Sequence, residues 1–408
     1  MLLVHKYGGT SVGDPERIKR VAQRVAKLKR EGHDLVVVVS AMGDTTDDLV
    51  ELAARVSPAG RKQHPREYDM LLTAGERIAM ALTAMAIRDL GVEAISLTGS
   101  QAAIITDESH TGAKIQEIRA TRVREELENG RVVIVAGFQG VSRAKEVTTL
   151  GRGGSDTTAV ALAAALEAER CDIFTDVDGV YSADPRKVAG ARRVRVIDYA
   201  EMVELATSGA QVMHPRAVEI GARYNIPIRV LSSFRDDDDE GTLITRKEKS
   251  MENLQLTGLA CEKSHVQIVV RGLPGGMDAT TEVLSRVADH KISVDMVTQA
   301  DTPDGKRQLQ LTVREDSVDE TMAICQEIAL RSGGSVHAQR ELTRVSMVGS
   351  GMHNSPGVYA QAYKALHAAG VEVHAVGSSA ITITVLVDTK DEEKAVRVLH
   401  GAFDFGSQ

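Results

Sequence analysis

The first 231 residues alternate between short apolar runs and longer amphipathic stretches. The run LVVVV at 35–39 is apolar at every position, which is typical of a strand buried on both faces of a parallel sheet. The stretch 15–31 instead spaces its apolar residues three and four apart, with Asp14 and Pro15 as the cap and first residue of a helix that ends before Gly32. Repetition of this unit predicts a three-layer α/β fold with a mostly parallel sheet, in which ligands bind at the carboxyl ends of the strands.

The other elements of this alternation follow from the same pattern. In chain order we expect a helix around 67–90, strands in AISLTGS and at 132–140, a helix at 156–169, a strand in CDIFT, two further helices, and a strand at 227–233. Residues 234–252 are expected to form a linker, in which the acidic run DDDDE at 236–240 is a solvated loop.

The pattern changes after the linker, where an internal repeat begins. Residues 265–299 align with 344–378, and each copy continues as a strand and a helix, which predicts the order βαββα twice, with about 70 residues in each copy. An extra strand is expected at 254–261, before the first copy. Two small α+β units after an α/β domain indicate regulation, although tandem repeats also serve as dimerisation surfaces.

The composition is ordinary for a soluble globular protein: 408 residues, 43% hydrophobic and 26% charged. This length indicates two to three domains. The net charge is −8, there is no Trp, and aromatic residues make up 3%. Because there is no dense basic stripe and little that could stack on bases, nucleic acid is not expected as a partner.

The three cysteines, Cys171, Cys261 and Cys325, are odd in number and far apart. They are typical of buried thiols in a reducing compartment rather than of disulfides or of a C-x-x-C metal site. We expect no signal peptide and no apolar stretch long enough to span a bilayer. A cytoplasmic protein without a membrane partner is therefore expected.

A glycine-rich segment, TTLGRGGSDTTA, precedes the apolar run of the helix at 156–169. Its glycines allow sharp turns and close approach of a ligand, and Arg152 and Asp156 place opposite charges in the same turn. Ser155 and Asp156 before the apolar run are a helix N-cap signal, and the free N–H groups at such a helix end can bind an anion.

A second glycine turn, KYGGTS, follows the strand at the start of the chain. Lys6 would place a positive charge among the backbone amides of Gly8 and Gly9, which suits a polyphosphate. Neither G-x-x-x-x-G-K-S/T nor G-x-G-x-x-G occurs after a strand, so the P-loop and Rossmann interpretations fail on spacing.

The sequence resembles the aspartate kinase family at KYGGTS, VVVSAMGDTTD, LTAGERI, TTLGRGGSDTTA, FTDVDGVYSADPR and the tandem repeat, almost from end to end. The resemblance implies an amino-acid-kinase fold followed by two ACT domains. It also implies phosphorylation of the side-chain carboxylate of L-aspartate with ATP and Mg²⁺, the first step toward lysine, threonine, methionine and diaminopimelate. A carboxylate is already ionised at neutral pH, so this reaction needs alignment and charge neutralisation rather than a general base.

The resemblance assigns roles to individual residues. The catalytic residues would be Lys6 and Asp156, and aspartate would be bound by Ser40, Thr46, Glu76, Arg152, Gly153, Gly154 and Ser155. ATP would be bound by Lys6, Tyr7, Gly8, Gly9, Thr175, Asp176, Tyr181, Asp184, Pro185 and Arg186. Within this set Arg152 would clamp a carboxylate of aspartate and Glu76 would take its ammonium group. No residue is assigned as a metal ligand.

Each role has a simpler alternative. Glu76 could cap or pair within its own helix, Arg152 could pair only with Asp156, and Tyr181 could be a core residue. One departure from the family puts a nucleotide contact in doubt, because Gln211 stands where many members carry a lysine that contacts ATP.

The repeat is expected to bind threonine, lysine or both as feedback effectors and to pair with other copies into a homo-oligomer. The effector residues implied by the resemblance are Gly275, Met277, Asp278, Ser293, Asp295 and Gln299 in the first copy and Asn354 and Pro356 in the second. The first copy has the turn GLPGGMD where the family has an Asp-x-Pro-Gly turn, so we expect weakened inhibition there. A small subunit started at Met251 is a further expectation, since some relatives make one.

The expected domains are a catalytic domain at 1–245, an extra strand with the first ACT domain at 254–335, and the second ACT domain at 342–405. Two other functions are alternatives to aspartate kinase. A member of the same fold acting on glutamate or a nucleotide would lack the tandem repeat and the LTAGERI segment. An amino-acid sensor with an inactive kinase domain would not be expected to keep Lys6, Glu76, Arg152 and Asp156.

Overall fold

The computed structural model describes residues 1–235, 239–247, 255–352, 357–403 and 405. The chain divides into two compact units. The first comprises Met1–Tyr181 and Arg193–Lys249, and the second comprises Ser182–Arg192 and Ser250–Gln408.

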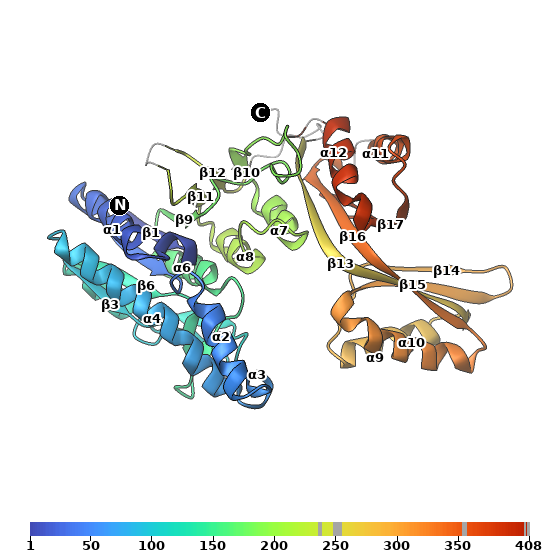
Figure 1. The fold of residues 1–408 in the computed structure, drawn as a ribbon, viewed down its shortest axis with the longest axis horizontal. Coiled ribbons are helices and arrows are strands. Elements are labelled where there is room, and N and C mark those ends of the chain that lie inside the picture. Colours follow the sequence, from blue (N-terminus) through green and yellow to red (C-terminus); the bar gives the residue numbers. More distant parts are fainter. Residues whose placement is uncertain (236–238, 248–254, 353–356, 404, 406–408) are drawn as a thin grey trace. The chain divides into compact units, whose positions relative to one another are not determined.

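The first unit is built on an eight-stranded sheet in the order β10-β12-β11-β9-β1-β2-β6-β3 (Figure 1). All of its strand pairs are parallel except β11 with β12. The mostly parallel α/β fold predicted from the apolar runs is thereby confirmed. The strands are β1 (Leu2–Tyr7), β2 (Asp34–Val39), β3 (Ala94–Leu97), β6 (Val132–Ala136), β9 (Arg170–Thr175), β10 (Val196–Ile197), β11 (Ile228–Ser232) and β12 (Thr242–Ile244).

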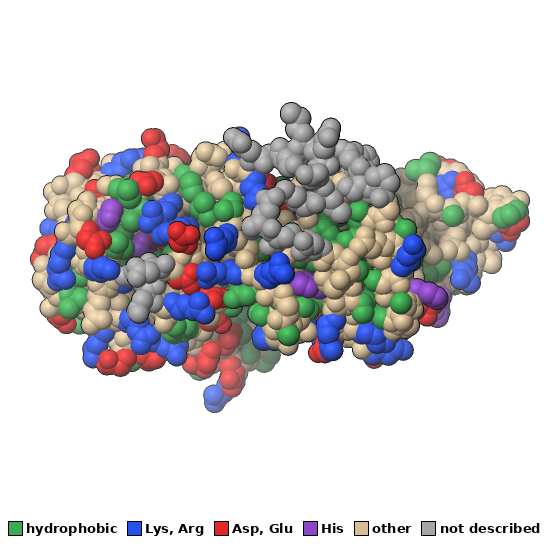
Figure 2. All heavy atoms as spheres, turned by 90° about the horizontal axis from the view of Figure 1, so that it is seen from above, with side chains coloured by type: hydrophobic (Ala, Val, Ile, Leu, Met, Phe, Trp, Pro, Cys, Tyr) green, Lys and Arg blue, Asp and Glu red, His purple; other side chains and the backbone are tan. Residues whose placement is uncertain are grey.

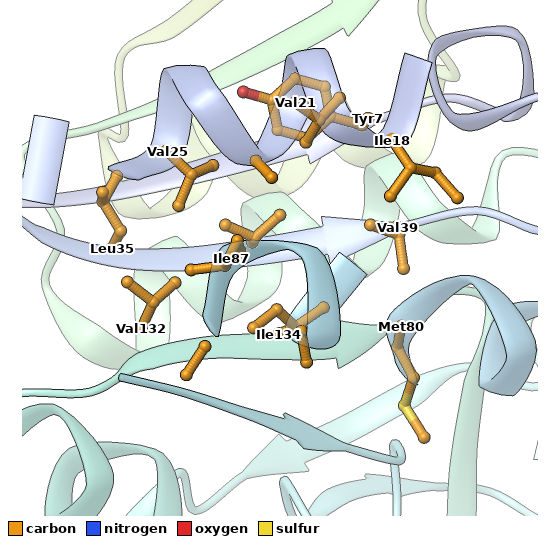
Figure 3. Close-up of a cluster of buried hydrophobic side chains, with 14 of the residues drawn as sticks. Tyr7, Ile18, Val21, Val25, Leu35, Val39, Met80, Ile87, Val132 and Ile134 are labelled. Atoms are coloured by element: carbon orange, nitrogen blue, oxygen red, sulfur yellow. The ribbon is translucent and has the colours of Figure 1, made fainter. Parts of the chain in front are cut away.

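Helices cover both faces of this sheet. On one face α1 (Pro15–Arg30) and α4 (Pro65–Asp89) pack on alternate residues of the strands, such as Leu35, Val37 and Val39 (Figure 3). The intervening residues Val36 and Val38 are equally buried, because α6 (Gly154–Leu166) packs against β1, β2 and β9. The remaining helices of this unit are α2 (Thr45–Val56), α3 (Gly60–Gln63), α5 (Thr121–Glu128), α7 (Tyr199–Thr207) and α8 (Pro215–Tyr224).

The first unit also contains a small four-stranded sheet in the order β5-β4-β7-β8, which was not predicted. Its strands span three or four residues each, which is too short for a hydrophobic period to be read from the sequence. They are β4 (Ile104–Thr106), β5 (Ile115–Ile118), β7 (Gln139–Ser142) and β8 (Val147–Thr149).

Two helices differ from expectation. The helix α6 begins at Gly154, with Gly153 in the left-handed region at φ 70° as its N-cap, so Ser155 and Asp156 lie inside the first turn rather than at the cap. The helix α4 is long and apolar enough to cross a membrane by length and composition, which corrects the sequence-based expectation that no such stretch exists. Half of its apolar window is buried, and it packs against α1, β3 and β6 as a core helix of the first unit.

The second unit contains one six-stranded sheet in the order β14-β15-β13-β16-β18-β17. The expected order βαββα occurs twice, but the extra strand expected at 254–261 is continuous with the first strand of the repeat, as the 20-residue β13. The strands are β13 (Gln255–Pro274), β14 (Val297–Asp301), β15 (Lys306–Arg314), β16 (Ser335–Ser350), β17 (Val373–Ser378) and β18 (Thr382–Asp388). The helices are α9 (Asp278–Asp289), α10 (Val318–Arg331), α11 (Val358–Ala368) and α12 (Glu392–Ala402).

The segment Ser182–Arg192, here called the strap, belongs to the second unit although it lies inside the expected catalytic domain 1–245. Its side chains Ala183 and Val188 are buried in the same apolar cluster as the second repeat. The carbonyl of Ser182 accepts a 2.8 Å hydrogen bond from the N–H of Leu259. The strap is therefore a structural part of the second unit.

The face of the molecule drawn in Figure 2 carries Lys and Arg side chains interspersed with Asp and Glu. The net charge of the whole sequence is −8.

Candidate active site

A cavity of about 280 Å³ lies at the carboxyl end of the main sheet in the first unit. It is formed where β1 and β2 end, where α4 passes, and where α6 begins. All the residues expected to act in catalysis or to bind aspartate lie together in its wall, with two more that were not assigned this role. The lining residues are Lys6, Ser40, Thr46, Glu76, Phe138, Gly151, Arg152, Gly153, Gly154, Ser155 and Asp156.

Lys6 and Asp156 form an ion pair, with 2.7 Å between Nζ and Oδ1. Lys6 is on β1 and Asp156 is in the first turn of α6, so the packing of this helix on the sheet brings the two charges together. Both residues are more than nine-tenths buried. A lysine held in this way, beside the N-terminal turn of a helix, is placed to meet a phosphate group.

The glycine turn after β1 is held by its backbone. The N–H of Gly8 donates a 3.2 Å hydrogen bond to the carbonyl of Phe174. We expected this N–H group to face a nucleotide, but it is used within the protein. A Cβ atom on Gly8 would lie 3.4 Å from Nζ of Lys6, which is ordinary van der Waals contact. A Cβ atom on Gly9 would lie 3.0 Å from the carbonyl oxygen of Ala41, so this turn and the loop after β2 pack backbone against backbone.

Glu76 projects from α4 into the cavity and is 3% exposed. Its Oε1 accepts a 3.3 Å hydrogen bond from the N–H of Ala41, and its buried Oε2 has no hydrogen-bond partner among the described residues. Burial raises the pKa of Glu76 to about 7. The preceding Gly75 lets α4 come this close, since a Cβ atom there would lie 2.8 Å from that of Ala41. The alternative that Glu76 pairs within its own helix finds no support in these contacts.

The Arg152 loop, defined as Leu150–Gly154, connects β8 to α6. Gly151 and Gly153 both have φ in the left-handed region, at 75° and 70°. Arg152 is exposed at the cavity, and the described residues include no ion pair between Arg152 and Asp156. Its guanidinium group is therefore placed to bind a ligand rather than to neutralise Asp156.

Two residues near this loop were missed in the sequence. Phe138 lines the cavity from a tight turn at φ 67°, and its carbonyl accepts a 2.9 Å hydrogen bond from the N–H of Leu150. His214, the N-cap of α8, packs so closely on the loop that a Cβ atom on Gly153 would lie 2.3 Å from it. Burial, followed by the charge of Arg216, lowers the pKa of His214. The glycine before Phe138 in AGFQG was the available signal for a tight turn.

The expected nucleotide residues are less uniformly placed. Tyr7 is fully buried and stacks on Phe174 with the ring centroids 4.7 Å apart, so its side chain is a core residue. Thr175 donates a hydrogen bond to Asp176, and Tyr181 donates one to Asp178. These residues do not line the cavity. Asp184, Pro185 and Arg186 belong to the strap in the second unit, where Asp184 and Arg186 pair with each other, and Gln211 is exposed.

The expected effector residues of the first repeat fall into two groups. Met277, in the turn before α9, contacts Gln299 on β14, as does Thr280, which was not among the expected residues. Asp295 instead pairs with Arg344 of β16. Gly275 lies in the same turn as Met277, Asp278 begins α9, and Ser293 is exposed; Asn354 and Pro356 lie outside the described residues, as does Met251.

The described residues contain no cluster of three or more His, Cys, Asp or Glu side chains that could hold a metal ion. Mg²⁺ does not require such a cluster, because it keeps several waters and is usually bound through one or two carboxylates and the phosphates of a substrate. Asp156, beside Lys6 in the cavity, is a carboxylate suited to that arrangement.

Known proteins share both units of this chain. The sequence profile of the amino acid kinase family matches residues 1–232, and that of an ACT domain matches residues 345–403. The aspartokinase of Mycolicibacterium smegmatis is 47% identical over 99% of this chain and 96% of that relative. The structure of E. coli aspartokinase III in complex with aspartate and ADP (R-state) matches with a TM-score of 0.81 at 27% identity, covering 99% of this chain and 100% of that one. The structure of the same enzyme in complex with lysine and aspartate (T-state) matches with a TM-score of 0.74 at 28% identity, covering 99% and 100%.

Proposed function

The chain belongs to the aspartokinases of the amino acid kinase family, and we propose that its cavity binds aspartate between Arg152 and Glu76 and aligns it with ATP at Lys6. An aspartokinase transfers a phosphoryl group from ATP to the side-chain carboxylate of L-aspartate, at the start of lysine, threonine and methionine biosynthesis. The ACT domains of the second unit are regulatory.

The observation that carries the assignment is the unsatisfied Oε2 of Glu76 in the wall of the cavity. A buried carboxylate oxygen without a donor is costly unless a ligand supplies one. The ammonium group of an amino acid supplies both the donors and the opposite charge. Arg152, at the same cavity, offers the planar fork that matches a carboxylate. A small amino acid with one ammonium and two carboxylate groups fits this pair of charges.

The chemistry needs no general base, because the attacking carboxylate is ionised at neutral pH. Lys6 neutralises the charge of the transferring phosphoryl group, and Asp156 holds the ammonium group of Lys6 in place across 2.7 Å. The first turn of α6, with Gly154 and Ser155, provides backbone donors close to the reacting groups.

ATP and Mg²⁺ are the proposed cofactors. An aspartokinase structure contains ADP, and Mg²⁺ would be held by the ATP phosphates, waters and Asp156, where it neutralises phosphate charge. Gly9, Thr175, Asp176 and Tyr181 of the first unit, and Asp184–Arg186 of the strap, remain proposed nucleotide-binding residues.

Regulation by amino acids is proposed at the second unit. An aspartokinase structure contains lysine, and we propose lysine, threonine or both as effectors of this chain. A homo-oligomer formed through the ACT domains at 254–335 and 342–405, a small subunit from Met251, and a cytoplasmic location belong to the same proposal.

Trapping of the product with hydroxylamine tests the proposed function. With aspartate and ATP, hydroxylamine should yield aspartyl hydroxamate at a rate that depends on added Mg²⁺, and lysine or threonine should lower that rate. Glutamate in place of aspartate should yield little. Hydroxamate from glutamate alone would instead favour another acceptor for this fold, and no hydroxamate with any acceptor would favour a sensor without kinase activity.

A further inference from the structure

A second carboxylate of α4, that of Asp69, is fully buried about two helical turns before Glu76. It does not line the cavity. Its Oδ1 accepts a 2.6 Å hydrogen bond from the hydroxyl of Thr149, and its Oδ2 lies 2.7 Å from Nδ1 of His110. The N–H of Thr111 donates to both oxygens, at 3.1 and 3.2 Å. Every one of these partners lies far from Asp69 in the sequence.

These contacts join three segments at the base of the Arg152 loop. Thr149 is the last residue of β8 and directly precedes that loop. The segment containing Thr111 packs beneath it, since a Cβ atom on Gly151 would lie 3.2 Å from the carbonyl oxygen of Thr111. The N–H of Ala113 donates a 2.9 Å hydrogen bond to the carbonyl of Thr149. Asp69 therefore fixes the place where the loop leaves the small sheet.

Arg216 of α8 holds the same region from another element. It donates hydrogen bonds of 2.8 and 3.0 Å to the carbonyls of Leu150 and Ala113. Because Gly151 and Gly153 have no side chains to pack, the path of the loop depends on such anchors at its base. A glycine-rich loop without them would lose the fixed geometry that a bidentate carboxylate clamp requires.

We propose that Asp69 is a positioning residue for aspartate: through Thr149 and Thr111 it holds the loop that presents Arg152 to the substrate. This inference rests on the proposed function of Arg152. A carboxyl group suits the site because its oxygens accept hydrogen bonds from both Thr111 and Thr149. Asparagine at this position would point its NH2 group, which donates hydrogen bonds, at the N–H of Thr111 or at the hydroxyl of Thr149, which also donate.

The test is steady-state kinetics of the full-length Asp69→Asn variant with each substrate varied in turn. A misplacement of about 1 Å lowers rates on the order of 100-fold, so kcat/KM for aspartate should fall by up to that factor. The KM for ATP should change by less than about threefold, because the nucleotide residues do not contact Asp69. Glu201→Gln is the matched control, since Glu201 is also a buried carboxylate of the first unit but accepts a hydrogen bond from the N–H of Asp198, the N-cap of α7. It should lower the thermal midpoint without a selective loss for aspartate.

A second pair of variants keeps the test informative if Asp69→Asn does not fold. Thr149→Ser retains the hydroxyl group that donates to Asp69, and Thr149→Val removes it with little change in volume. Only the valine variant should lose kcat/KM for aspartate selectively. In a protein that already carries Arg152→Ala, Thr149→Val should lower kcat/KM for aspartate by less than about threefold. The loop of that protein has no guanidinium group to position.

The outcomes separate the two proposals. If Arg152→Ala impairs aspartate use but Thr149→Val behaves like Thr149→Ser, the positioning role is wrong and the proposed function stands. Losses that multiply fully in the double variant, or that affect both substrates equally, also overturn the positioning role. If Arg152→Ala leaves aspartate kinetics unchanged, the proposed function of Arg152 is wrong, and the role of Asp69 falls with it.

Discussion

Replacement of Glu76 by glutamine should stabilise the ligand-free protein while weakening its use of aspartate. Burial raises the pKa of Glu76 to about 7 from an ordinary value of 4.5, so folding favours the protonated form of this side chain. Below pH 4.5 the group is protonated whether the protein is folded or unfolded, and it has no effect on stability. As the pH rises toward 7, the unfolded state loses the proton first and stability falls; above 7 the loss is complete.

The size of the effect follows from the shift in pKa. A shift from 4.5 to about 7 corresponds to about 3 kcal/mol at high pH, at about 1.4 kcal/mol per unit. Glutamine has the same shape as protonated glutamate and carries no charge at any pH. The stability that Glu76→Gln gains should therefore increase by about 2 kcal/mol between pH 5.5 and pH 8.5.

Urea unfolding of the ligand-free variant and the parent at these two pH values measures the gain. In parallel, kcat/KM for aspartate in the parent should fall tenfold per pH unit below about 7, because only the carboxylate binds the ammonium group. This limb of the profile should be absent in Glu76→Gln, whose kcat/KM should be uniformly low. A stability gain that does not grow with pH, or a limb that survives the substitution, would refute the reasoning.

Four further outcomes are expected. Lys6→Ala should abolish turnover with circular dichroism unchanged, since its charge serves the phosphates; near-normal kcat would contradict this role. Arg152→Ala should lower kcat/KM for aspartate by ~30-fold to ~1000-fold, the effect of a lost carboxylate clamp, and a loss confined to ATP would contradict it. Met277→Pro should tighten inhibition by threonine or lysine without changing uninhibited kcat. Proline restricts the backbone of the turn before the effector binds and so lowers the entropic cost of ordering it by about 0.5–1 kcal/mol. Unchanged inhibition constants would count against that site. The fragment 251–408 should fold alone, as judged by circular dichroism. Its thermal midpoint should be lower than that of the same fragment joined by a linker to a copy of the strap. Equal midpoints would show that the strap does not stabilise that core.

The sequence was sufficient for the order of the main elements and for placing the residues at strand ends in one site, whereas the roles of Glu76 and Arg152 came from the resemblance to aspartate kinases. Parallel strands bring their carboxyl ends to the same edge of a sheet. Once the strands were recognised, Lys6 near the end of β1 and Ser40 directly after β2 could therefore be placed at that edge. Helix starts with strong caps could also be predicted. Asp14 caps α1 as expected, accepting a 2.9 Å hydrogen bond from the N–H of Arg17, with Pro15 as the first residue.

What the sequence could not show depends on contacts between distant segments. The buried Asp69 looks like any polar residue of an amphipathic helix until β8 and the Thr111 segment are placed beside it. Phe138 reads as part of an apolar strand, and only its left-handed backbone turns it into the cavity. The start of α6 was misjudged because two glycines with positive φ replace the usual side-chain cap.

The strap is the clearest case of a role that local pattern conceals. Its sequence, SADPRKVAGAR, continues directly from the loop after β9 and reads as one acidic, turn-rich connection. Its two fully buried apolar side chains, Ala183 and Val188, are five residues apart and are too few to predict a core segment. Yet they are buried with the second repeat, while Lys187 forms an ion pair with Glu392 of α12 at 2.5 Å. Thr175, Asp176 and Tyr181 precede the strap in the chain, so the backbone joins these proposed nucleotide residues of the first unit to a segment packed in the second.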